Sequence, residues 1–159
     1  MAIKFIYTLF LALLVSLFVG LGISSFYPGP KSPEYPQTLT NMKENCQCQP
    51  TAEELASFQE FERANKLYME ESQVYNRNVS IISLLAAIII LVSSLTLLNK
   101  IKMIADGILL GGVFTTMYSI IRGLMSEDSQ FRFVIVTVGL LIALALGYIK
   151  FIRPKEAVS

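Results

Sequence analysis

Histidine and tryptophan are absent from this sequence, and cysteine occurs only twice in its 159 residues. The absence of histidine removes the commonest metal ligand and the side chain that most often transfers protons near neutral pH. Charged residues are also scarce, because they form 16% of the chain, against about a quarter in an average soluble domain. We therefore expect no cofactor and no histidine-based metal or catalytic site.

Long apolar runs are what the sequence does contain, since 53% of its residues are hydrophobic. A helix of roughly 20 apolar residues crosses a membrane core about 30 Å thick. Residues 5–26, 79–98, 103–121 and 133–149 meet that requirement. The net charge of +1, without a basic stripe among aromatics, argues against a nucleic-acid partner. The sequence predicts an all-α, four-transmembrane-helix bundle in a lipid bilayer.

The predicted order of segments follows from these runs. A signal peptide has an apolar core of about 7–15 residues, and the first run is longer. Gly22-Ile23-Ser24 is also a poor cleavage site, so we expect this span to be retained, whereas cleavage would leave three spans. The segments are transmembrane helix 1 (1–26), an extracytoplasmic proline-rich strap (27–50), an outer helix continuing into transmembrane helix 2 (51–98), transmembrane helix 3 (103–123), transmembrane helix 4 (131–152) and a tail (153–159).

The placement of basic residues predicts the orientation, because Lys and Arg close to span ends tend to stay in the cytoplasm. One face of the predicted bundle has a dense set in very short segments: Lys4, Lys100, Lys102, Lys150, Arg153 and Lys155. The remaining basic residues are spread over a much longer length and are accompanied by glutamates. We expect both termini to be cytoplasmic, in a bacterial cytoplasmic membrane.

The segment between the first two spans has two parts. Prolines 28, 30, 33 and 36 exclude a helix and predict an extended strap, which acts either as a docking peptide or, as we favour, as a stiff connector. Thr51 and Glu54 then form a capping box that starts a helix. Neither proline nor glycine follows until Gly107, so this helix is expected to continue into the second span as an extracytoplasmic helical extension.

The outer helix has one aromatic face with heptad spacing, which directs a stripe of side chains toward a partner helix. We call this face the aromatic ridge and define it by Phe58, Phe61, Tyr68 and Tyr75. A row of aromatics among glutamates is typical of a contact surface. Two interpretations stay open: the ridge packs on the strap of its own chain, or it contacts another copy or another membrane protein.

Cys46 and Cys48 form a C-x-C pair in the strap. They could bridge to another chain, bind a soft metal such as Cu(I), or form a small strained disulfide. Oxidation is expected outside the cytoplasm, and a lone C-x-C is a weak metal signal. We favour a redox-linked structural role over metal binding.

Small residues recur at every fourth position within the spans, a pattern that lets helix backbones approach closely. The candidate packing residues are Gly107, Gly111, Thr115 and Ser119 in the third span and Gly139, Ala143 and Gly147 in the fourth. Asp106 and Arg122 are the charged residues nearest to a span interior, and both lie at its ends. Lys102 can pair with Asp106 one turn away, and Arg122 can extend toward water, so neither requires a conducting function.

Several short motifs resemble an uncharacterised family of small four-span bacterial membrane proteins. They are Phe26-Tyr27-Pro28, Pro33-Glu34-Tyr35-Pro36, Tyr75-Asn76-Arg77-Asn78, Gly111-Gly112-Val113-Phe114-Thr115 and Tyr118-Ser119-Ile120-Ile121-Arg122-Gly123. The resemblance covers nearly the whole chain and implies the four-span topology, but it implies no activity. Claudins also have a large outer segment after the first span, but they depend on a tryptophan motif that this chain lacks.

The sequence supplies no nucleophile with a base, no paired acids and no metal set, so we do not expect an enzyme. A non-enzymatic scaffold or accessory subunit, acting through helix–helix contacts, is the function that the pattern favours. The alternative is a small oligomeric channel or transporter assembled around the third span. A third hypothesis, an enzyme at the outer interface, requires a catalytic glutamate that the sequence does not single out.

Overall fold

The computed structural model describes residues 2–34, 52–97 and 101–149. The described residues form four helices and no strand: α1 (Ala2–Phe26), α3 (Ala52–Leu97), α4 (Lys102–Leu124) and α5 (Ser129–Gly147). All four are long and apolar enough to cross a membrane. This confirms the all-α class and the four helices of spanning length. The Thr51 cap, Cys46, Cys48 and the tail lie outside the described residues.

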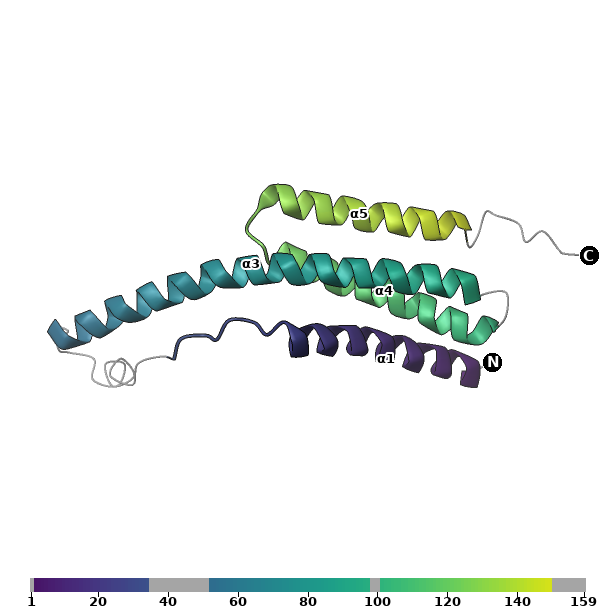
Figure 1. The fold of residues 1–159 in the computed structure, drawn as a ribbon, viewed down its shortest axis with the longest axis horizontal. Helices are drawn as coiled ribbons and strands as arrows, with labels where there is room; N and C mark the ends of the chain where they lie inside the picture. Colours follow the sequence, from purple (N-terminus) through teal and green to yellow (C-terminus); the bar gives the residue numbers. More distant parts are fainter. Residues whose placement is uncertain (1, 35–51, 98–100, 150–159) are drawn as a thin grey trace, which may run out of the picture. The chain divides into compact units, whose positions relative to one another are not determined.

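The chain divides into two compact units, Met1–Pro28 with Asn76–Ser159, and Gly29–Tyr75. In the first unit α4 contacts each of the other helices. In Figure 1, α1 and α5 lie on opposite sides of the crossing α3 and α4. Leu11 of α1 lies against Gly107, Leu91 of α3 lies against Gly112, and Ile135 of α5 lies against Gly123. In the most apolar 18 residues of each helix, 39% are buried in α4 and 33% in α3, against 11% in α1 and 11% in α5. The centre of this unit is therefore the α3–α4 pair.

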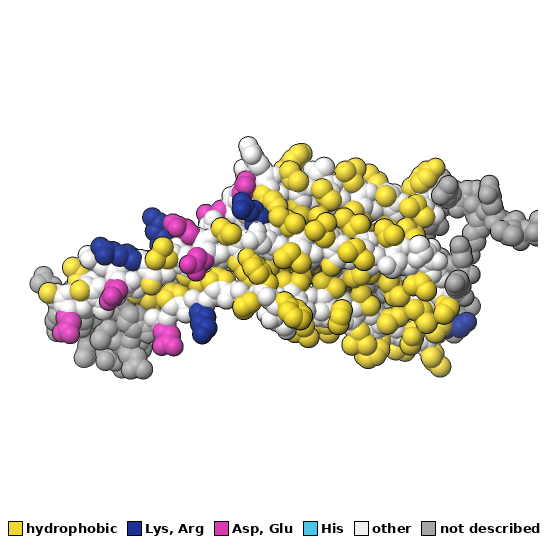
Figure 2. Space-filling view, viewed as in Figure 1, with side chains coloured by type: hydrophobic (Ala, Val, Ile, Leu, Met, Phe, Trp, Pro, Cys, Tyr) yellow, Lys and Arg dark blue, Asp and Glu magenta, His cyan; other side chains and the backbone are white. Residues whose placement is uncertain are grey.

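α3 is a single helix of 46 residues, which corresponds to about 69 Å at about 1.5 Å per residue. It contains neither proline nor glycine, the residues that most readily end or kink a helix. Residues 76–97 belong to the first unit, and residues 52–75 belong to the second. The side chains of the four-helix part are mostly apolar in Figure 2, whereas charged side chains gather along residues 52–75.

The turn between α4 and α5 is built by local hydrogen bonds. The backbone N–H groups of Met125 and Ser126 bond to the carbonyl oxygens of Arg122 and Gly123, which closes the last turn of α4. The Asp128 carboxylate then accepts from the backbone N–H groups of Gln130 at 3.0 Å and Phe131 at 3.2 Å. This is an N-cap, and it satisfies donors that the first turn of a helix leaves without partners.

Candidate functional site

A polar contact between α3 and α4 lies in the centre of the first unit. The Ser80 hydroxyl donates to the carbonyl oxygen of Ser119 at 2.8 Å, and the Ser119 hydroxyl donates to the carbonyl oxygen of Ser80 at 2.7 Å. Further along, the Ser94 hydroxyl donates to the carbonyl oxygen of Ala105 at 2.7 Å. All three serines are fully buried. The small residues thus bring two backbones close enough for side chain to backbone bonds between the helices.

A second polar group surrounds Arg122 near the end of α4. Its Nη1 donates to Oδ1 of Asn76 at 2.8 Å, and its Nε donates to the Tyr118 hydroxyl at 3.1 Å. The guanidinium carbon lies 5.5 Å from the centre of the Tyr118 ring, within cation–π range. Asn78, two residues after Asn76, donates from Nδ2 to the Tyr27 hydroxyl at 3.0 Å. These contacts join the middle of α3 to the end of α4 and to the residue that follows α1.

The sequence predicts that Arg122 extends toward water, with Glu127, Asp128 and the region of Arg77 as plausible neighbours. On α3 it bonds to Asn76, which directly precedes Arg77. The Arg122 side chain is instead half-buried, and Asn76 is buried. Asn76 lies where the charged first half of α3 gives way to its apolar second half. This position is the sequence signal that could have identified it. The sequence indicated the region of Arg77 as a neighbour of Arg122, but it did not single out the Asn76 side chain as the acceptor, because the two residues are 46 positions apart.

The predicted packing residues fall into two groups. Gly107, Gly111, Thr115, Ser119 and Gly139 are buried. Ala143 is exposed, and a Cβ added to Gly147 would meet nothing within 4 Å.

Gly112, absent from the predicted set, makes the closest approach. A Cβ built there would lie 2.6 Å from Cδ2 of Leu91. The third span therefore contributes small residues on two faces rather than one.

The aromatic ridge belongs to the second unit and is partly covered. Phe61, Tyr68 and Tyr75 are half-buried, and Phe58 is 42% exposed. A Cβ added to Gly29 would lie 3.1 Å from Cε1 of Tyr75, so the beginning of the strap packs on this ring. Residues 35–50, the remainder of the strap, lie outside the described residues. The ridge thus contacts its own chain at Tyr75.

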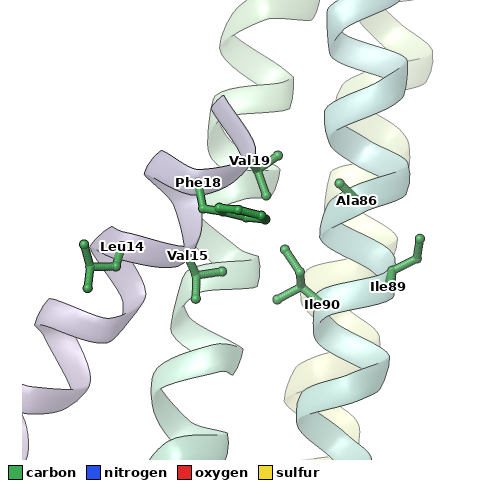
Figure 3. A pocket seen from close by; sticks show the side chains of 7 residues that line it. All are labelled: Leu14, Val15, Phe18, Val19, Ala86, Ile89 and Ile90. Carbon is green, nitrogen blue, oxygen red and sulfur yellow. The ribbon is translucent and has the colours of Figure 1, made fainter. Parts of the chain in front are cut away.

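Two of the cavities in the first unit are lined entirely by described residues. The larger, about 420 Å³, is an apolar groove between α1 and α3, lined by Leu14, Val15, Phe18, Val19, Ala86, Ile89 and Ile90. Figure 3 shows Phe18 and Ile90 pointing toward each other across it. The other, about 400 Å³, lies where α1 and α4 begin and is lined by Lys4, Phe5, Thr8, Lys102, Met103 and Asp106.

The chemistry available in this part of the chain is mainly that of packing and hydrogen bonding. Every buried side-chain nitrogen or oxygen of the described residues has a hydrogen-bond partner. Within the same residues, no group of three or more Cys, Asp or Glu side chains could hold a metal ion.

No family model, curated protein or solved structure matches the chain. The resemblance to small four-span bacterial membrane proteins therefore stays a prediction, and the geometry is the basis for a functional proposal.

Proposed function

We infer that this chain is a non-enzymatic integral membrane scaffold or accessory subunit that acts through helix–helix contacts. The observation that carries the proposal is the position of the aromatic ridge on α3. The ridge residues lie on the same uninterrupted helix as a candidate span, and Phe58 keeps 42% of its surface exposed. A row of aromatics that keeps part of its surface exposed is typical of a contact surface. The contacting protein is another membrane protein or a second copy of this chain.

The proposed orientation places both termini in the cytoplasm of a bacterial cell and residues 27–78 outside. Support comes from the density of Lys and Arg beside span ends and from the charged side chains along residues 52–75. At about 1.5 Å per residue, the 24 residues from 52 to 75 form about 36 Å of helix. This length is available for contact with the ectodomain of a neighbouring protein.

The bonding inside the first unit favours packing over conduction. Ser80 and Ser119 bond to each other's carbonyl oxygens, and the Arg122 guanidinium bonds to Asn76 and Tyr118. Polar groups engaged in this way hold helices together. The channel or transporter alternative requires a path between polar groups, and the hydrogen bonds described between the helices do not form one.

The experiment that tests the proposal replaces Phe61 and Tyr68 together by serine. The variant and the wild type are purified from native membranes in mild detergent, and the copurified proteins and the oligomeric mass are compared. We expect the wild-type complex to be lost, because two aromatic side chains leave the contact. Leu67→Ser is the matched control, since Leu67 is 61% exposed outside the ridge. If the double variant kept the same copurified proteins and the same oligomeric mass, the proposal would lose its main support.

A further inference from the structure

The cavity at the start of α1 and α4 combines charge with apolar surface. Lys4 comes from the first turns of α1, and Lys102 is the first residue of α4. Both lysine side chains are exposed and line the same cavity of about 400 Å³. Phe5 and Met103, which follow the two lysines in the sequence, line it as well. Two cations therefore meet beside apolar side chains at the ends of two candidate spans.

The ends of membrane-spanning helices lie at the level of lipid headgroups, where basic side chains attract anionic lipids. A phospholipid is amphipathic in the same way as this cavity, with a phosphate beside an apolar chain. The three ionisable side chains of the cavity, Lys4, Lys102 and Asp106, have a combined formal charge of +1. That charge complements the single negative charge of one phosphodiester.

We propose that this cavity binds the headgroup phosphate of an anionic phospholipid. Lys4 and Lys102 hold the phosphate, Phe5 and Met103 contact the beginning of the acyl chains, and the Thr8 hydroxyl lines the cavity while donating to the Lys4 carbonyl oxygen at 2.9 Å. Asp106 is half-buried and faces the same cavity, where its carboxylate limits the site to one phosphodiester. The proposal rests on the membrane placement of α1 and α4 but not on the partner contact of α3.

The test is native mass spectrometry of the full chain, released from nanodiscs of phosphatidylcholine with a minor fraction of phosphatidylglycerol. The wild type is expected to retain one phosphatidylglycerol in preference to phosphatidylcholine. Lys4→Gln and Lys102→Gln are each expected to lower that preference about fivefold, the effect of losing one basic residue near the membrane surface. Lys66→Gln is the matched control, because Lys66 is an exposed lysine of the second unit. The control is expected to retain the lipid as the wild type does.

Lys4→Arg and Lys102→Arg serve as conservative variants that keep the charge. They are expected to preserve the preference, which distinguishes loss of the phosphate contact from loss of the fold. Retention that is equal in the wild type and both glutamine variants would overturn the proposal. If Lys66→Gln lowered the preference for phosphatidylglycerol equally, the proposal would also be overturned, because the lipid would then be attracted by the overall positive charge and not by this cavity. Displacement of the lipid by millimolar inorganic phosphate would assign the site to free phosphate instead.

Discussion

At the scale of single residues, Gly111 shows how closely the helices of the first unit approach. A Cβ added there would lie 2.8 Å from Cβ of Val15 and 3.2 Å from the carbonyl oxygen of Ala12. The second atom belongs to the backbone of α1, which cannot move away as a side-chain end could. The position therefore requires glycine for packing rather than for backbone conformation.

Overpacking a well-packed contact costs about 1–3 kcal/mol, and replacing glycine by alanine in a helix gains about 1 kcal/mol. We therefore predict that Gly111→Ala destabilises the protein by up to about 2 kcal/mol. Reversible unfolding in mixed micelles measures the difference. Gly20→Ala is the matched control, because a Cβ at Gly20 meets nothing within 4 Å. Its stability should equal or slightly exceed that of the wild type, and equal stability of Gly111→Ala would contradict the packing of α1 on α4.

Asn76 is the second residue whose role can be measured separately. Its side-chain oxygen accepts a 2.8 Å hydrogen bond from Arg122, and bonds to charged groups contribute about 1.5–3 kcal/mol. We predict that Asn76→Ala lowers the free energy of unfolding by about 1.5 kcal/mol, because Arg122 is half-buried and recovers part of its solvation. The neighbouring exposed Arg77, changed to alanine, should have little effect. Equal losses in both variants would show that the Asn76–Arg122 bond is not responsible.

Sequence patterns locate some of these residues but not their partners. The four-residue spacing of small side chains identifies Gly107 and Gly111, which are buried against α1. The same spacing includes Ala143, which is exposed, because a repeat on one helix does not determine which part of it a neighbour covers. The contacts of Gly112 and of the Asn76–Arg122 pair depend on which faces of α3 and α4 meet. Residues far apart in the sequence determine that together.

At the scale of elements, helix boundaries depend on local polar groups that hydropathy does not record. The apolar run had placed the fourth transmembrane helix at 131–152, whereas α5 begins at Ser129. Its first turn is polar and is anchored by Asp128. An aspartate directly before the helix is a start signal. For α3 the sequence was sufficient, because the absence of proline and glycine predicted that the helix continues without a break.

The Asp128 cap leads to a prediction about α5. Asp128→Ala should destabilise the protein by about 1 kcal/mol, since two backbone N–H groups lose their acceptor. Glu127→Ala, a change at the preceding exposed carboxylate, should leave stability within about 0.5 kcal/mol of the wild type. The same unfolding assay compares the two variants. A larger loss in Glu127→Ala than in Asp128→Ala would contradict the assigned cap.

At the scale of the whole molecule, the all-helical class and the four helices of spanning length followed from apolar run length. Function did not follow, because packing faces do not specify what they bind. The proposed topology makes a direct prediction for a Cys46→Ser, Cys48→Ser background. An impermeant maleimide added outside cells should label Glu60→Cys and Glu127→Cys but not Lys102→Cys until the membrane is opened. Labelling of Lys102→Cys in intact cells would show that this end of the bundle faces outward, which is the opposite of the proposed orientation.

The most direct test of the functional account is photo-crosslinking in native membranes. A photoreactive phenylalanine analogue at Phe61 reports on the aromatic ridge, and the same analogue at Leu67 reports on an exposed position outside it. The account predicts one discrete product of higher mass from position 61, identified by mass spectrometry as another membrane protein or a second copy, and none from position 67. Crosslinks from position 61 that stay within the same chain would show that the ridge packs on its own strap, and would contradict a role in partner contact.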